Sequence, residues 1–325
     1  GLFQCVEAST SGSSSSGGCW APLKGAEIKG GVLQIIDVQT SGDRSGGGAV
    51  AAARLAVANS SVEIQGASCI GADSGGGALL VMKTIRSRQA SDLENGPAFL
   101  AERTSLRLTS CQTIGKNSPG GALSLQSADL YQVDLVVNQS MTAGDDSNGG
   151  AIQVSGTLEL LATELSVAAA STTGERASGG AIAAGVLIVG DGARIHSRDT
   201  NTTGTQARGG SISCDELQVH GAIHVNAALT TGARSSGGGL EVSGMCVIAM
   251  GALVEVVDAL VIGVSSDGGG LAVAVLEVRG RLTVQRTEAD GRGGALFVSG
   301  SMAAPGIVEL DTSFGGADGA SFFVG

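Results

Sequence analysis

The chain is poor in aromatic residues: Phe, Trp and Tyr together make up 2% of its 325 residues. With a hydrophobic content of 42%, its core must be built from Val, Leu, Ile and Ala. Only four prolines accompany the 54 glycines, which excludes collagen and polyproline. Basic residues are also few, 19 against 30 acidic ones, and the net charge of −11 leaves no basic patch, so we expect no nucleic acid to bind.

Histidine and cysteine are too few to form a recognisable metal motif. His220 and His224 have a spacing that would place both on one face of a strand, without a third ligand. The six cysteines contain no C-x-x-C pair, so we expect no zinc site and no cofactor. Cys5 and Cys19 lie in one repeat and could meet across a turn, whereas the other four are expected to be buried thiols.

One apolar stretch, residues 245–264, has the length of about 20 residues that a membrane-spanning helix needs. Glu255 and Asp258 lie inside it and would be costly in hydrocarbon. We therefore predict no membrane span.

What the sequence has in abundance is a repeat of about 30 residues that ends in Thr-x-Gly-x-x-x-x-Gly-Gly. We call the second Gly of each Gly-Gly the origin of a repeat. The origins are Gly18, Gly48, Gly77, Gly121, Gly150, Gly180, Gly210, Gly238 and Gly269, with shorter echoes at Gly294 and Gly319. Six residues before the first nine origins lie Gly12, Gly42, Gly71, Gly115, Gly144, Gly174, Gly204, Gly232 and Gly263. A fixed period of this length predicts a solenoid.

Within each repeat, short runs alternate between apolar and polar residues, as in Ile152 and Val154, and this period of two predicts strands. Apolar residues recur two and four positions past the origins, so each repeat must lie directly on the last. We predict an all-β, right-handed parallel β-helix of about 11 rungs of roughly 25–31 residues, with about 4.8 Å between rungs. Residues 95–100 are interpreted as a worn origin that splits the long interval from Gly77 to Gly121 into two short rungs.

We expect residues 1–325 to form a single solenoid. The chain enters the repeat partway and stops just after an origin, without a visible capping segment. Because solenoids need capping repeats, we expect this chain to be a segment of a longer repeat protein.

The turn before each origin also has a fixed threonine, eight residues before it. These threonines are Thr10, Thr40, Thr113, Thr142, Thr172, Thr202 and Thr230, and Cys69 and Val261 take the same position in two repeats. Serine recurs three residues before the origins. In stacked rungs we expect ladders of hydroxyl groups that bond one to the next, with the glycine between them supplying a positive φ. We interpret this turn column as structural.

Two functional interpretations of the turns compete with that one. Ice binding would need two rows of Thr, and the residue two positions after each Thr is glycine. Calcium binding would need six to eight oxygen ligands, and Asp145 with Asp146 is the best candidate. However, Arg44, Arg176 and Lys116 occupy equivalent positions, which favours a solvated turn with ion pairs between rungs.

The chain shows few signs of catalysis. Polysaccharide-active β-helices need clustered acids and a base, and only the pair Asp145 and Asp146 resembles such a cluster, without a Gly-His-Gly companion. Trp20 and Tyr131, which could form a sugar platform, are far apart in the sequence. We therefore predict no enzyme activity and no catalytic residue. N-x-S/T sequons at Asn59, Asn138 and Asn201 are possible glycosylation sites in a secreted protein.

The repeat core, as in Gly149-Gly150-Ala151-Ile152, resembles the GGA[IL] repeats of polymorphic outer-membrane adhesins. It is also similar to glycine-rich β-helix repeat proteins predicted in dinoflagellate algae. It departs from the adhesins in lacking their F-x-x-N companion, of which Phe3-Gln4-Cys5-Val6 is the nearest trace. The resemblance implies a right-handed β-helix with a surface, adhesive or structural role, and no catalytic residue.

From these observations we expect a non-catalytic structural or adhesive rod that presents stacked turns to partner proteins or a surface. Its partners would be other protein chains, bound through rung ends or lateral contacts, and surface glycans, in an extracellular or cell-surface location. The alternative is a polysaccharide-active or carbohydrate-binding β-helix. A groove with three or more converging acids would favour that alternative.

Overall fold

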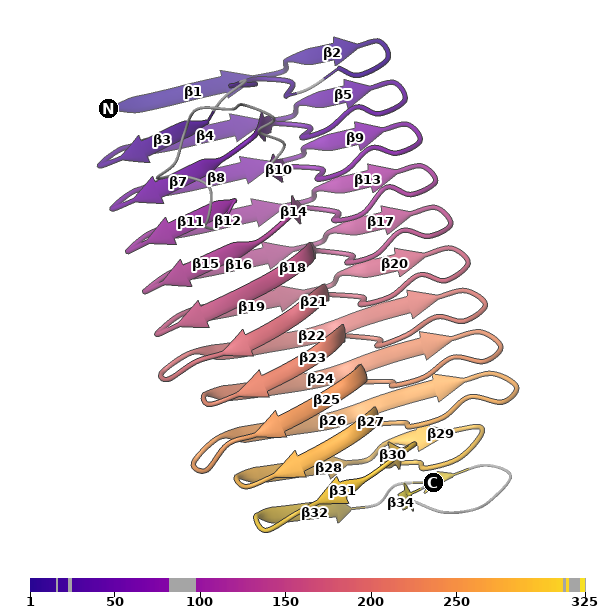
Figure 1. The fold of residues 1–325 in the computed structure, drawn as a ribbon. Coiled ribbons are helices and arrows are strands. Elements are labelled where there is room, and N and C mark those ends of the chain that lie inside the picture. Colours follow the sequence, from indigo (N-terminus) through magenta and orange to yellow (C-terminus); the bar gives the residue numbers. More distant parts are fainter. Residues whose placement is uncertain (16, 23–24, 82–97, 312–313, 316–321, 325) are drawn as a thin grey trace, which may run out of the picture.

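A computed structural model describes residues 1–15, 17–22, 25–81, 98–311, 314–315 and 322–324. In these residues the secondary structure is all β, and the strands pair in parallel, each with its equivalent one rung away (Figure 1). The predicted parallel β-helix is confirmed. One ladder contains β1 (Leu2–Val6), β4 (Val32–Ile36), β8 (Ser61–Gln65), β12 (Ser105–Thr109), β16 (Asp134–Asn138), β19 (Glu164–Ala168), β22 (Arg194–Thr203), β24 (Ala222–Thr231), β26 (Leu253–Ile262), β28 (Arg281–Gln285) and β32 (Ile307–Asp311).

A second ladder faces the first across the core. It contains β3 (Ala26–Lys29), β7 (Leu55–Ala58), β11 (Phe99–Glu102), β15 (Ala128–Tyr131), β18 (Ile152–Leu161), β21 (Ile182–Val189), β23 (Ile212–Val219), β25 (Leu240–Ile248), β27 (Leu271–Val278), β30 (Leu296–Val298), β31 (Met302–Ala303) and β34 (Phe322–Val324), with β6 (Val50–Ala52), β10 (Leu79–Val81) and β14 (Leu123–Leu125) as separate first halves in early rungs. β14 pairs with the start of β18 and β15 pairs with its end, so the long strands of later rungs are two short strands joined.

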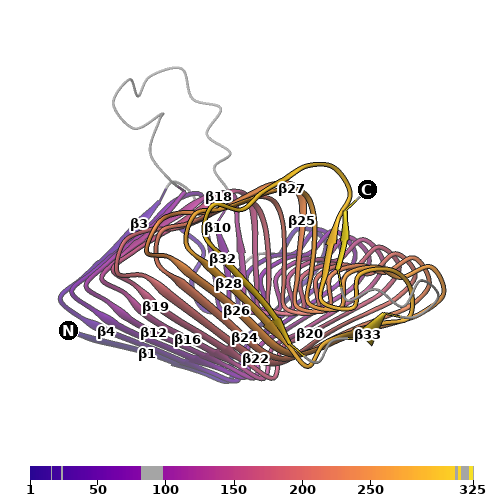
Figure 2. The same ribbon diagram turned by 90° about the horizontal axis from the view of Figure 1, so that it is seen from below.

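Seen along the stack, the turns form a narrower lobe beside the main body (Figure 2). The short strands that lead into this lobe are β2 (Ser9–Ser11), β5 (Gln39–Ser41), β9 (Ser68–Ile70), β13 (Gln112–Ile114), β17 (Met141–Ala143), β20 (Ser171–Thr173), β29 (Glu288–Ala289) and β33 (Phe314–Gly315). The lobe therefore contains the Thr and Gly positions of the repeat.

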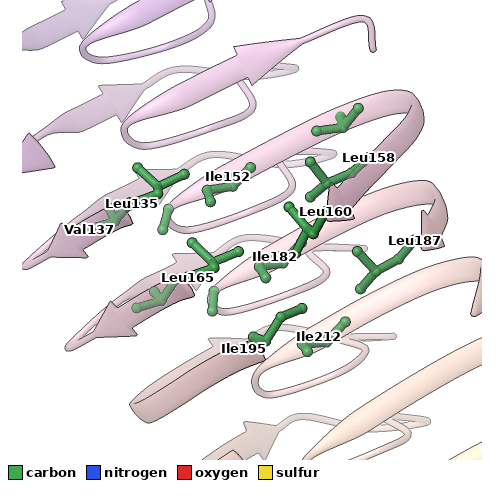
Figure 3. Close-up of a cluster of buried hydrophobic side chains, with 14 of the residues drawn as sticks. Leu135, Val137, Ile152, Leu158, Leu160, Leu165, Ile182, Leu187, Ile195 and Ile212 are labelled. Carbon is green, nitrogen blue, oxygen red and sulfur yellow. The ribbon is translucent and has the colours of Figure 1, made fainter. Parts of the chain in front are cut away.

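The core is a stack of aliphatic side chains that point inward from both ladders (Figure 3). Ile152 stacks on Ile182 through the β18–β21 register, and Leu135 stacks on Leu165 through β16–β19. All four are at most 1% exposed, and each such side chain contributes about 1.5–3 kcal/mol relative to remaining in water. The predicted apolar column two residues past the origins is confirmed, since it is buried from Val50 to Leu296.

The interpretation of residues 95–100 as a second origin is wrong. Ser61 pairs directly with Ser105, so the interval that contains these residues is one long rung. Phe99 pairs with Leu55 and occupies a second-strand position, rather than one just past an origin. It is fully buried and fills that column as an aliphatic residue does elsewhere. Part of the proposed origin, residues 95–97, lies outside the described residues.

The apolar stretch of residues 245–264 contains the end of β25 and all of β26. Across the part of the chain that the structure describes, no helix has the length and hydrophobicity needed to cross a membrane.

The cysteines divide as predicted. Cys5 and Cys19 form a disulfide that ties β1 to the chain just past the first origin. Cys69, Cys111, Cys214 and Cys246 are buried free thiols. Burial raises the pKa of Cys69 to about 11 and that of Cys111 to about 12, so these thiols remain protonated and unreactive.

Candidate functional site

The turn column is built around glycines whose backbone conformation disfavours any side chain. The nine glycines six residues before the origins have φ between +119° and +150°, a region that side chains rarely adopt. A Cβ on Gly144 would overlap the carbonyl oxygen of Gly115 in the preceding rung, and one on Gly174 would overlap that of Gly144. Each glycine therefore allows the next turn to approach at the rung spacing.

The threonine hydroxyls do not form the predicted ladder. Thr142 Oγ1 donates to the carbonyl oxygen of Gly149 at 2.9 Å, within its own rung. The equivalent threonines of other rungs make the same bond, at Thr40, Thr113, Thr172, Thr202 and Thr230. Equivalent hydroxyls on neighbouring rungs can bond elsewhere, since Thr231 Oγ1 donates to Thr203 Oγ1 at 3.1 Å. In the turn column the hydroxyls instead donate to the glycine carbonyl of their own rung. Thr10 to Thr40, at 3.5 Å, is the closest approach to the predicted pattern.

The serines do connect rungs, but through the backbone. Ser118 Oγ accepts a hydrogen bond from the backbone N–H of Ser74 at 3.2 Å and donates one to the carbonyl oxygen of Gly71 at 2.9 Å. The predicted bond from one serine hydroxyl to the next is replaced by these contacts, because a backbone group lies between neighbouring hydroxyls.

The two acids proposed for calcium are engaged within the stack. Arg176 donates to both carboxylate oxygens of Asp146, at 2.5 and 2.6 Å, and holds the pKa of that carboxyl below its usual range. Asp145 accepts a hydrogen bond from the backbone N–H of Glu175 at 3.0 Å. The described residues contain no group of three or more His, Cys, Asp or Glu side chains suited to a metal. Calcium binding stays an untested prediction, which these contacts do not favour.

The three sequons differ in accessibility. Asn59 is exposed at a corner of its rung, and so is Ser61, the hydroxyl residue of the same sequon. Asn138 is half-buried, and its partner Ser140 is buried. The Oδ1 of Asn201 is buried without a hydrogen-bond partner among the described residues. Asn59 is therefore the sequon that a glycosylating enzyme can best reach.

The predicted pairing of His220 with His224 on one strand is wrong, because His220 lies in the corner between β23 and β24. His224 instead stacks on His196 of the preceding rung, with ring centroids 4.9 Å apart. His196 bonds Glu164 and His224 bonds Glu255, each at 2.9 Å. Partners about 30 residues apart in the sequence could have been found only by aligning the rungs.

In the middle rungs a groove lies between the lobe and the second ladder. Residues two positions before an origin face residues three positions past the next origin. Thus a Cβ on Gly46 would touch the side chain of Leu80, and Arg208 Nη1 lies 3.8 Å from Glu241 Oε1. The polar residues that line this groove are Asn148, Gln153, Ser155, Ser178, Arg208, Ser213, Asp215, Glu241 and Ser243. We call these the groove residues.

Glu241 is the most unusual groove residue. It is 7% exposed, and Ser213 Oγ donates a hydrogen bond of 2.9 Å to its carboxyl group. Burial raises the pKa of Glu241, while Arg208 opposes that shift. Asp215, close enough to raise this pKa further, is exposed and accepts a hydrogen bond of 2.9 Å from Ser243. A carboxyl with a raised pKa beside an exposed acid in a groove is a candidate binding site.

An aromatic cluster lies in the same column two rungs further on. The strand register places Ala272 next to Glu241, then Phe297, then Phe323. The two phenylalanine rings stack with centroids 5.3 Å apart. The guanidinium of Arg292 lies 4.7 and 5.0 Å from the two centroids. These groove and aromatic residues were not predicted from the sequence, although Arg208, Glu241 and Phe297 depart from the small residues beside them in their columns.

Comparisons with protein-family models, curated proteins and solved structures find no match to this chain.

Proposed function

We propose that this protein is a non-catalytic structural or adhesive rod that presents its stacked turns to partner proteins or to a surface. One observation supports this most strongly: a ladder of eleven parallel strands runs without a break from β1 to β32. Such a ladder is stiff, because every interior strand is hydrogen-bonded on both sides. The turns then form a ridge whose backbone is fixed and whose exposed side chains vary.

Contacts with other chains would use that ridge or the rung ends. Four residues before the origins, non-glycine residues have a positive φ, including Arg44, Asp73 and Arg234. These side chains stand outward at rung spacing and offer charges for lateral contacts. At the two ends of the described ladder, β1 pairs only with β4 and β32 pairs only with β28. The free side of such an edge strand can accept a further rung from this chain or another.

An extracellular or cell-surface location fits two features. The Cys5–Cys19 disulfide persists in oxidising compartments. The exposed sequon at Asn59 is accessible to glycosylation if the protein is secreted by a eukaryote. Both features lie in the first rungs of the stack.

The catalytic alternative has less support, since the groove contributes two acids, Asp215 and Glu241, where a third was required. The test combines electron microscopy with an assay for new reducing ends on a panel of polysaccharides. We expect uniform rods that associate laterally or end to end, and no polysaccharide cleavage. Cleavage that Asp215→Asn or Glu241→Gln abolishes would overturn the proposal.

A further inference from the structure

Two groove side chains depart from the residue types that the repeat uses at their positions. The column of Glu241 holds Ala183 and Ala272 in nearby rungs, so stacking does not require a carboxyl there. The column of Arg208 holds Ser178 on the neighbouring rung. Burying a carboxyl is costly, and residues that break a local pattern without a structural need are expected at functional sites.

We propose that the groove residues bind a chain of neutral sugars laid along the rod. Carboxyl, hydroxyl, amide and guanidinium groups line the groove together, so both donors and acceptors face the same space. Sugar hydroxyl groups both donate and accept hydrogen bonds, so a sugar chain needs both kinds of partner. The acids at Asp215 and Glu241, with the net charge of −11, disfavour uronates and sulfated chains.

An extended peptide is a weaker fit to this groove. Peptides commonly add a strand to a free sheet edge. The strands β21, β23, β25 and β27 are each paired on both sides. On the opposite wall, Ser178, Arg208 and Ser236 also bridge to neighbours on both sides. Recognition must therefore come from side chains, which suits a ligand that carries its own hydroxyl groups.

The groove also sets the minimum length of the ligand. Phe297 follows Glu241 by two rungs in the same column, a distance of about 10 Å along the axis. Ala272, a small residue, lies between them in that column. The polar groups and the aromatic cluster are thus reached together only by an oligosaccharide, and we expect affinity to rise with chain length.

The test is calorimetric titration with cello-, laminari-, manno- and xylo-oligosaccharides, with oligogalacturonate as the anionic counterpart. The variants are Glu241→Ala and Arg208→Ser, which introduce residues that neighbouring rungs already hold at these positions. We expect at least one neutral series to bind, and each variant to weaken it roughly tenfold through lost hydrogen bonds. The matched control Glu255→Ala, on the other ladder, should bind as the wild type does.

The proposal is overturned if no neutral series binds the wild type, if oligogalacturonate binds more tightly, or if both groove variants bind like the wild type. Hydrogen exchange on the wild type gives a readout that is independent of variant folding. Saturating oligosaccharide should slow exchange in β23, β25 and β27, and protection confined to other strands would also overturn it. The sugar site goes beyond the rod function, which would stand if no sugar bound.

Discussion

Thr142 Oγ1 donates a hydrogen bond of 2.9 Å to the carbonyl oxygen of Gly149, seven residues further along the same rung. The bond closes the turn within its own rung, and both Thr142 and Gly149 are buried. The threonine column thus fixes the shape of each turn. The neighbouring glycine and serine columns fix the distance from each turn to the turn of the next rung.

Replacing Thr142 with Val keeps the shape of the side chain and removes this bond. Val261 already occupies the same column and is fully buried, so valine fits there. We expect Thr142→Val to lower the free energy of unfolding by about 1 kcal/mol, because the Gly149 carbonyl loses one of its two donors and keeps only the backbone N–H of Gly121. Urea unfolding followed by circular dichroism measures the change. The exposed Thr205→Val is the control, and equal stability of both variants would count against the turn assignment.

Replacing Gly144 with Ala should be far more damaging than an ordinary glycine substitution. Its φ of +142° alone costs about 1–3 kcal/mol for a side chain, and the Cβ would also overlap the Gly115 carbonyl. Gly251 also has a positive φ, but a Cβ there would meet nothing within 4 Å. Gly251→Ala should therefore lose only about 1–2 kcal/mol. Similar urea midpoints for the two variants would refute the close approach of the turns.

Removing the disulfide with Cys5→Ser and Cys19→Ser should loosen one end of the rod. A closed loop of about 15 residues contributes about 3 kcal/mol, and solenoid rungs contact only their neighbours. Hydrogen exchange should therefore speed up in β1 and β2 and remain unchanged from β19 onward. Faster exchange along the whole chain would mean that the stack unfolds as one unit.

The stability of the wild type should depend on pH through Glu241. Its folded pKa is raised above an unfolded value of about 4.3, so the fold favours the protonated carboxyl. The stability gained by burying the protonated carboxyl is fully present below the unfolded pKa, and it is lost as pH rises through the folded pKa. Glu241→Gln should therefore gain stability relative to the wild type across that window. Urea unfolding at a series of pH values measures the difference, with the exposed Glu216→Gln as control. Parallel pH profiles for the wild type and Glu241→Gln would contradict the burial of this carboxyl.

The regular part of the fold could be predicted from the sequence because it repeats. The glycine spacing and the apolar columns at Ile152 and Val154 were enough to give strands, stacking and the buried face. The hydrogen bonds within the turn could not be predicted, because they depend on whether Thr142 lies nearer to the next threonine or to its own Gly149. The long rung was misread because Phe99 fills a second-strand column that aliphatic residues fill elsewhere.

The groove escaped prediction for a different reason. Arg208 and Glu241 lie more than a full rung apart in the sequence and meet only when residues before one origin are set against residues past the next. His196 and His224 are instead direct partners in the β22–β24 register, one rung apart, and their stacking becomes evident only when the rungs are aligned. Aligning the rungs first, and then searching for residues that break each column, would have found both pairs.

The central claim is that the repeated columns hold the rod together, while the side chains that break those columns bind a ligand. Its most direct test is to measure urea stability and oligosaccharide affinity for both Thr142→Val and Glu241→Ala. We expect Thr142→Val to lose stability and keep its affinity, and Glu241→Ala to keep or gain stability and lose roughly tenfold in affinity. The claim is contradicted if Thr142→Val loses affinity at unchanged stability, or if Glu241→Ala loses stability and binds like the wild type.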